Sequence, residues 1–166
     1  MKKLSFAVVF LLLITMIISL SGCGKAAEKA AQKGMEKALE EATGGKVDIA
    51  NDGTKIEIDG QSFTAGDNLA WPKDSMGDLP EPKAKVTAVM KGSEKEGSVV
   101  IISEFQDGKG YVQKLKDIGY EDIMSMEDTN GFIYVGKKAI SAEKSAIVNV
   151  AVGSGGKDGS ITYSIE

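Results

Sequence analysis

From residue 46 onward, short apolar runs with a period of two are separated by turns rich in glycine, asparagine and aspartate. Val47 and Ile49 alternate with polar residues before Asn51-Asp52-Gly53, and Ile56 and Ile58 alternate after it. A period of two predicts β-strands, and Asn-Asp-Gly between two such runs predicts a hairpin. Because connectors this short cannot join parallel neighbours, the pattern restricts the chain to a mainly antiparallel sheet.

The same pattern continues to the C-terminus and is interrupted by one helical segment. Tyr111, Val112, Leu115 and Ile118 recur at helical spacing, and Gly119 is placed to end the helix in a left-handed conformation. We therefore expect an α+β fold: an N-terminal helix, a small β-ribbon, and a mainly antiparallel sheet with one packed helix in the order β-β-α-β-β-β-β. Strands are predicted around residues 47–49, 56–58, 62–64, 86–90, 99–102, 123–126, 132–135, 146–152 and 161–165.

The segment 25–43, KAAEKAAQKGMEKALEEAT, consists mainly of strong helix formers and ends at Gly44-Gly45. Most of its apolar positions are too small to bury much area, so we interpret it as a stalk helix. Four lysines follow one another at four-residue spacing, which predicts a row that either contacts anionic lipid or is solvated among neighbouring glutamates. The apolar positions are Ala27, Ala31, Met35, Ala38 and Ala42, and the lysines are Lys25, Lys29, Lys33 and Lys37.

The residue types present exclude most familiar enzyme classes. The chain has no histidine and a single cysteine, and all of its 20 basic residues are lysine. Common zinc sites, histidine-dependent nucleophiles and disulfide frameworks are therefore excluded, and no catalytic residue, metal site or cofactor is predicted. A serine–lysine pair, paired carboxylates or an oxygen-ligand metal site are the alternatives that this inventory leaves. The net charge of −4 argues against a nucleic-acid partner.

Two loops carry partial motifs that do not meet the requirements of the full motifs. Gly153 to Asp158 has the glycines and lysine of a phosphate-binding loop, but a strand is expected after it instead of a helix. Asp128 to Gly131 begins like a calcium loop but lacks the distal glutamate. We expect a hairpin loop and a plain turn.

The N-terminus has the three parts of an export signal. Lys2 and Lys3 precede an apolar stretch from Leu4 to Leu20, and Leu20-Ser21-Gly22-Cys23 closes it. This resembles a bacterial lipoprotein signal with its lipobox. The resemblance implies cleavage after Gly22, a diacylglyceryl group on Cys23 and no other cofactor. The alternatives are an uncleaved transmembrane helix or, for Cys23, a free thiol or an intermolecular disulfide.

As a whole, the chain resembles uncharacterised small lipoproteins of Gram-positive bacteria. The resemblance rests on the LSGC lipobox, the junction EKALEEATGGKVDI and the helix YVQKLKDIGY before a run of strands. It implies a lipid-anchored protein on the extracytoplasmic face of the cell membrane. The expected organisation is a signal peptide (1–22), a lipidated N-terminus with the stalk helix (23–45), a ribbon (46–64), a proline- and glycine-rich connection containing Trp71 (65–82) and an α+β domain (83–166).

We expect a non-catalytic module of the cell envelope. Besides membrane lipid through the anchor, its partner would be a protein, a peptide or a wall component bound by a sheet face or a free edge. The alternative is a small-molecule or ion-binding lipoprotein that serves a membrane transporter or sensor. Trp71, in an irregular segment, is predicted either to cap the core or to form a partner surface. The other aromatic residues at strand and helix positions are expected in the core: Tyr111, Tyr120, Phe132 and Tyr134.

Overall fold

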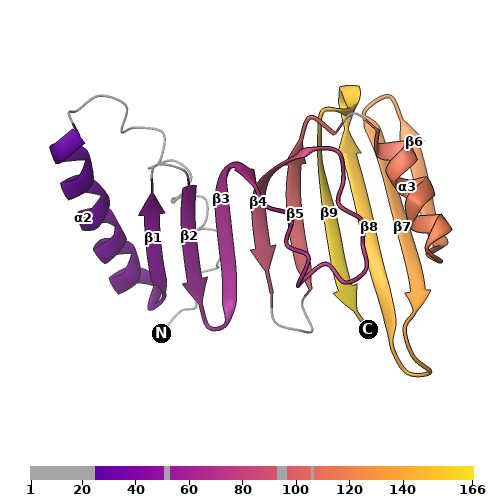
Figure 1. Cartoon of the computed structure of the whole chain (residues 1–166), viewed down its shortest axis with the longest axis horizontal. Coiled ribbons are helices and arrows are strands. Elements are labelled where there is room, and N and C mark those ends of the chain that lie inside the picture. The colour runs from indigo at the N-terminus through magenta and orange to yellow at the C-terminus, as the bar shows by residue number, and fades with distance from the viewer. Residues whose placement is uncertain (1–24, 51–52, 93–96, 106) are drawn as a thin grey trace.

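The structure is a computed structural model that describes residues 25–50, 53–92, 97–105 and 107–166. Within these residues, two α-helices accompany one nine-stranded antiparallel sheet (Figure 1). A mainly antiparallel sheet in an α+β arrangement is therefore confirmed. The elements are α2 (Lys25–Thr43), β1 (Lys46–Ala50), β2 (Gly53–Ile58), β3 (Gln61–Leu69), β4 (Lys85–Lys91), β5 (Ser98–Ser103), α3 (Gly108–Asp117), β6 (Glu121–Asp128), β7 (Gly131–Ala139), β8 (Ser145–Gly153) and β9 (Asp158–Ile165).

The strands lie in the order β1-β2-β3-β4-β5-β9-β8-β7-β6. After β5 the chain passes through α3 to the far edge, and β6 to β9 return as a meander until β9 pairs with β5. The ribbon expected at 46–64 is continuous with the rest of the sheet, because β3 pairs with β4. Since β3 extends to Leu69, the irregular connection covers residues 70–84 and begins later than the sequence indicated.

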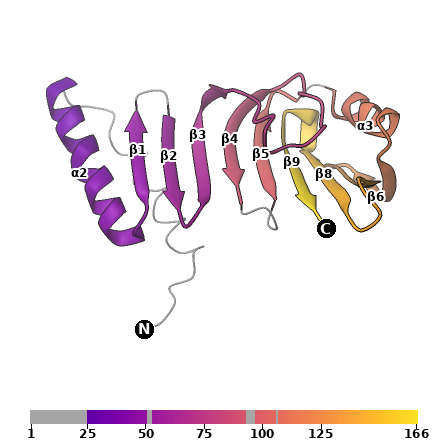
Figure 2. The same cartoon turned by 60° about the horizontal axis from the view of Figure 1, so that its bottom comes forward.

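The core lies on one face of the C-terminal half of the sheet, here called the inner face. Alternate residues of β5, β8 and β9 point to this face, and Val100, Val148 and Ile161 are fully buried there. Helix α3 and the connection 70–84 cover it, and Figure 2 shows both on the same side of the sheet. The period of two in these strands thus produces one layer of side chains beneath a helix and a coil.

Helix α3 begins and ends at the residues that its sequence predicts. The Asp107 carboxylate accepts a hydrogen bond from the Gly110 backbone N–H (3.0 Å), which caps the first turn. Gly119 has a φ of 98°, and the Tyr120 N–H donates to the Leu115 carbonyl (3.0 Å), so the helix ends in a Schellman motif. The predicted left-handed end at Gly119 is confirmed.

Helix α2 lies along β1 and closes that edge of the sheet. The Ile49 N–H donates to Glu36 Oε1 (2.9 Å), and the Val47 N–H donates to Glu40 Oε1 (3.2 Å). Two carboxylates one helical turn apart therefore satisfy backbone donors of an edge strand.

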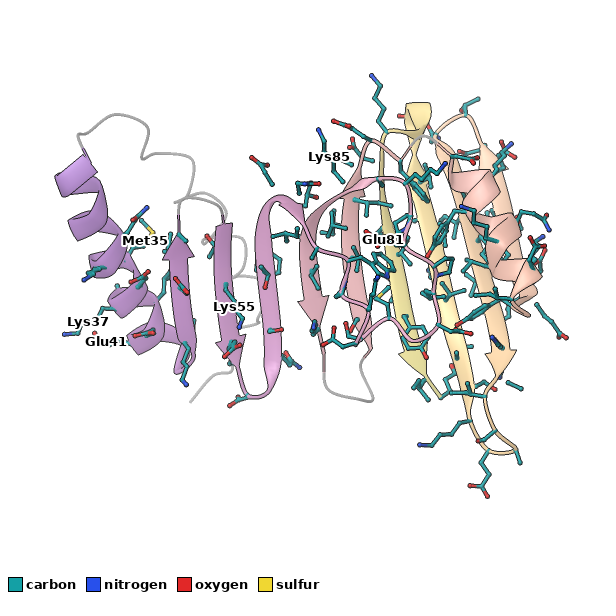
Figure 3. The ribbon with its side chains drawn as sticks, viewed as in Figure 1. Met35, Lys37, Glu41, Lys55, Glu81 and Lys85 are labelled. Atoms are coloured by element: carbon teal, nitrogen blue, oxygen red, sulfur yellow. The ribbon has the colours of Figure 1, made fainter. Side chains whose placement is uncertain are left out.

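Of the predicted apolar positions of α2 whose side chains are described, Met35 is more buried than Ala38 and Ala42. Met35 and Leu39 are half-buried, whereas Ala38 and Ala42 are exposed. In Figure 3, Met35 lies on the side of the helix that faces β1, and Lys37 points away from the sheet. The side chains of Met35 and Leu39 are long enough to span the gap between the helix and the neighbouring strand, whereas an alanine side chain is too short.

Candidate functional site

The residues of the predicted lipid anchor lie outside the described part of the chain. They are Leu20, Ser21, Gly22 and Cys23. In the parts that are described, neither helix combines the length and hydropathy needed to cross a membrane.

The predicted lysine row lies on α2. Lys33 and Lys37 are exposed, while the side chains of Lys25 and Lys29 are not among those that the structure describes. Lys33 and Lys37 border the glutamates Glu36 and Glu40, whose carboxylates reach β1, and both lysine side chains are open to solvent. This position suits either contact with lipid or solvation.

Trp71 is in the core, so the prediction that it forms a partner surface is wrong. Its side chain is 6% exposed and packs in the same cluster as Met76 and Leu79, which are also buried. The connection 70–84 folds back over the inner face, and the indole is the largest apolar group it can contribute there. Its Nε1 finds no hydrogen-bond partner among the described residues.

A polar cluster, here called the Asp78 clamp, fastens the connection to the sheet. It consists of Asp78, Tyr120 directly before β6, and Lys138 on β7. The Tyr120 hydroxyl donates to Asp78 Oδ1 (3.1 Å), and Lys138 Nζ forms an ion pair with Asp78 Oδ2. Lys138 Nζ also lies 5.6 Å from the centre of the Tyr120 ring, within cation–π range.

The electrostatics of the clamp suit attachment better than proton transfer. Burial pushes the pKa of Asp78 up, but hydrogen bonds from Lys138 and Tyr120 outweigh it and hold that pKa below its usual value. Burial, followed by the charge of Asp78, raises the pKa of Tyr120. Both groups therefore keep one protonation state near neutral pH, which is the opposite of what a general acid or base requires.

Replacement of Asp78 with asparagine is expected to lower the free energy of unfolding at neutral pH by about 1 kcal/mol, because the pair is partly solvated. The depressed pKa means that the carboxylate stabilises the fold above its ordinary pKa of 3.8 and loses this effect as the pH falls through the lower, folded value. The difference between the wild type and Asp78→Asn should therefore narrow on acidification. Urea unfolding from neutral pH to about pH 2 measures it. Glu143→Gln is the matched control, and a difference independent of pH would contradict the assignment.

The opposite face of the C-terminal half, here called the outer face, carries exposed apolar side chains. Four of them form the outer patch: Ile101 (44% exposed), Met124 (41%), Met126 (61%) and Ile133 (39%). Strand register places Met126, Ile133, Ala151, Ser160 and Ile101 in one row across β6, β7, β8, β9 and β5. An apolar surface of this kind, in contact with solvent, is typical of interaction sites.

A shallow hollow of about 590 Å³ lies within the outer face. Ala151 and Ser160 are the small members of the row, and the larger Ile133 and Ile101 flank them. The residues that line the hollow also include Asp128, the last residue of β6, and Asp158, the first residue of β9. The hollow therefore has an apolar floor and an acidic rim, and it could receive an apolar group that carries a nearby positive charge.

Strand β6 forms the second edge of the sheet. Within the described residues it pairs only with β7, and every one of its residues is exposed. Lys109 and Lys116 of α3 form ion pairs with Glu127 and Asp122 of β6 (both 2.7 Å), which attach the strand to the helix across the inner face. The hydrogen-bonding edge of β6 is left without a neighbouring strand.

The sequence contained a signal for the outer face. Val99-Val100-Ile101-Ile102 is apolar without alternation, which is typical of a strand with apolar side chains on both faces. This run predicts β5 as a strand but does not say which face is covered. In the structure Val100 and Ile102 are buried, and Ile101 is exposed.

The two loops with partial motifs have the simple structures expected of them. The Asn130 N–H donates to Asp128 Oδ1 (2.7 Å), which closes a tight turn between β6 and β7. The loop at 153–158 joins the paired strands β8 and β9 as a hairpin. Among the residues placed by the structure, no group of three or more acidic or cysteine side chains is positioned to hold a metal ion.

Comparison of the chain with protein-family models, curated proteins and solved structures found no match to any of them.

Proposed function

We propose that this chain is a membrane-anchored lipoprotein on the extracytoplasmic face of the cell membrane, and that its sheet is a non-catalytic binding module of the envelope. The LSGC motif at Cys23 supports the anchor. The outer patch is the observation that carries the binding role. Its residues lie on a face that is open to solvent, and large apolar side chains in such a place favour a protein or peptide partner.

The composition of the outer patch suits an adaptable protein contact. Met124 and Met126 are unbranched and flexible, so they can repack against partners of different shape. Ile133 and Ile101 are stiffer and frame the hollow between them. A surface that combines both types supports association with another polypeptide better than the orientation of one small substrate.

In this proposal α2 is the stalk that connects Cys23 to the sheet. If Lys25, Lys29, Lys33 and Lys37 face an anionic membrane, each contributes about 1 kcal/mol to membrane contact. The exposed positions of Lys33 and Lys37 support such a contact and equally support a solvated face. The charge on α2 would then add to the attachment that the two acyl chains of the diacylglyceryl group on Cys23 provide.

A small-molecule- or ion-binding lipoprotein is the second proposal, and the volume of the hollow supports it. A hollow of about 590 Å³ falls in the range of ligand pockets. However, Met126 and Ile133 beside it are themselves exposed to solvent, so a small ligand would remain largely uncovered. The protein-binding proposal is stronger for this reason.

The experiment is site-specific photocrosslinking from position 124 in cells that carry the tethered chain. A crosslinker in place of Met124 is expected to capture a discrete partner. Met126→Lys combined with Ile133→Lys should reduce the yield about tenfold, because lysine on the patch must be desolvated at an apolar interface. Met126 and Ile133 are both exposed, so this double substitution should leave the fold intact.

Ile140→Lys is the matched control, because Ile140 is 49% exposed but follows β7 outside the outer patch. It should leave the crosslinking yield unchanged. Equal yields from the patch variant and the wild type would show that the outer patch does not bind the partner.

A further inference from the structure

The two edge strands of the sheet, β1 and β6, differ in whether another element covers their outer side. At β1, the carboxylates of Glu36 and Glu40 accept the N–H groups of Ile49 and Val47. At β6, no described element pairs with the outer edge, although the strand extends from Glu121 to Asp128. Proteins normally shorten, cover or charge such an edge, because an open strand recruits other strands. The open edge of β6 is therefore a candidate docking site.

The side chains of β6 define what could dock there. The sequence EDIMSMED has an apolar centre, in which Ile123 (57% exposed), Met124 and Met126 are accessible, and two acidic residues at each end. Ion pairs to α3 occupy Asp122 and Glu127, but Glu121 and Asp128 form no ion pair within the described residues. The strand carries no basic residue.

Charge argues against a second copy of this chain as the occupant. Antiparallel pairing of β6 with itself about Ser125 would place Asp122 opposite Asp128 and Ile123 opposite Glu127. A shift by one residue would set Glu121 against Asp128 and Asp122 against Glu127. Like charges directly opposite one another destabilise a strand pair, so near-complete self-pairing is disfavoured in these registers.

We infer that β6 accepts an extended segment of a partner protein as an added strand, and that this segment has an apolar centre with lysine or arginine at its ends. The inference rests on the proposed function and specifies the chemistry of the partner. Backbone hydrogen bonds to the free edge provide the attachment. Basic ends complement Glu121 and Asp128, and apolar side chains on the outer side extend the surface that begins with Met124 and Met126.

The test uses the full chain in detergent and a fluorescein-labelled peptide of eight residues, with two lysines at each end and alternating valine and threonine between them. Fluorescence anisotropy at low salt should show binding, and a peptide with glutamate in place of lysine should bind at least about tenfold more weakly. Glu121→Gln combined with Asp128→Asn should weaken binding of the lysine peptide by about tenfold. Asparagine at 128 keeps the oxygen that caps the turn with Asn130.

The matched control for charge is Glu41→Gln combined with Glu143→Gln. Both residues are exposed and neither belongs to β6, so the net charge changes equally while the edge is unaltered. This control should leave the affinity for the lysine peptide unchanged. Weakening by both double variants alike would reduce the effect to overall charge and overturn the inference.

Strand addition is separated from charge attraction by two N-methylated versions of the lysine peptide. One carries N-methyl groups at odd positions and the other at even positions, so each loses the N–H donors of one edge. An added strand uses only one edge, so one version should lose binding by at least about tenfold and the other should retain it. Equal affinities for the two versions would overturn strand addition.

The remaining outcomes are also decisive. No binding of the lysine peptide above the glutamate peptide would overturn the inference, and a dimer of the full chain that the lysine peptide dissociates would assign the edge to a second copy. The proposed function is tested separately: it is overturned if the yield of photocrosslinking from position 124 does not change on substitution of Met126 and Ile133. Crosslinking that depends on the patch, together with equal binding of both methylated peptides, would retain the function and reject strand addition alone.

Discussion

Replacement of Cys23 with alanine is expected to abolish incorporation of a fatty-acid probe and to release the protein from the membrane fraction. The chain contains no other cysteine, so no second thiol can accept the diacylglyceryl group. Metabolic labelling with an alkyne fatty acid, followed by fractionation of the cells, measures both effects. Loss of the lipid removes about 0.8 kcal/mol of membrane attachment for each methylene that no longer enters the bilayer, which amounts to complete release for two or more chains.

Ser21→Ala is the control for this experiment. Alanine is also small, so the motif should still be processed and the label should remain on Cys23. Labelling that persists in Cys23→Ala would place the lipid elsewhere, and an intact segment 1–22 in the mature protein would favour the uncleaved helix. Either result would remove the basis for the proposed location.

Replacement of Leu115 with alanine is expected to reduce the free energy of unfolding by about 2–5 kcal/mol. Leu115 is fully buried in the core cluster, on the side of α3 that covers the inner face. Its truncation would leave a cavity beside residues that cannot close it, because α3 is fixed by its caps and by the ion pairs of Lys109 and Lys116 with β6. Urea unfolding followed by the emission of Trp71 measures the loss, since this single tryptophan is buried.

Lys114→Ala is the matched control on the same helix. Lys114 is exposed, and alanine is a strong helix former, so the free energy of unfolding should change by less than about 0.5 kcal/mol. A loss from Leu115→Ala no greater than that from Lys114→Ala would mean that α3 does not pack on the sheet as described.

Local patterns in the sequence predicted the local structure well. The period of two located the strands, and Gly119 marked the end of α3, because both depend only on neighbouring residues. Pairing between distant strands could not be predicted in this way. The insertion of β9 between β5 and β8 brings Val100 next to Ile161, and nothing in either strand alone specifies that neighbour.

The candidate site was harder to predict than the fold for a physical reason. Trp71 lies in a segment without periodicity, so its burial depends on how the connection 70–84 folds back over the sheet. The outer patch depends on which of two apolar faces is covered, and Ile101 and Ile102 look alike in sequence. The aromatic residues were easier to predict. Tyr111 on α3, Tyr134 on β7 and Tyr120 shortly after the end of α3 are buried as expected, and Phe132 is partly buried against the core. The lipid anchor at Cys23 remains a prediction.

The carboxylates of Glu36 and Glu40 have a consequence for how many molecules can assemble. Fibrils grow when every unit offers two open edges, so that each added unit exposes a new one. Here Val47 and Ile49 already donate their N–H groups to α2, so a strand received at β6 finds no second vacancy across the sheet. The described part of the chain itself therefore offers one free edge, and its own copies cannot stack through both sides of the sheet.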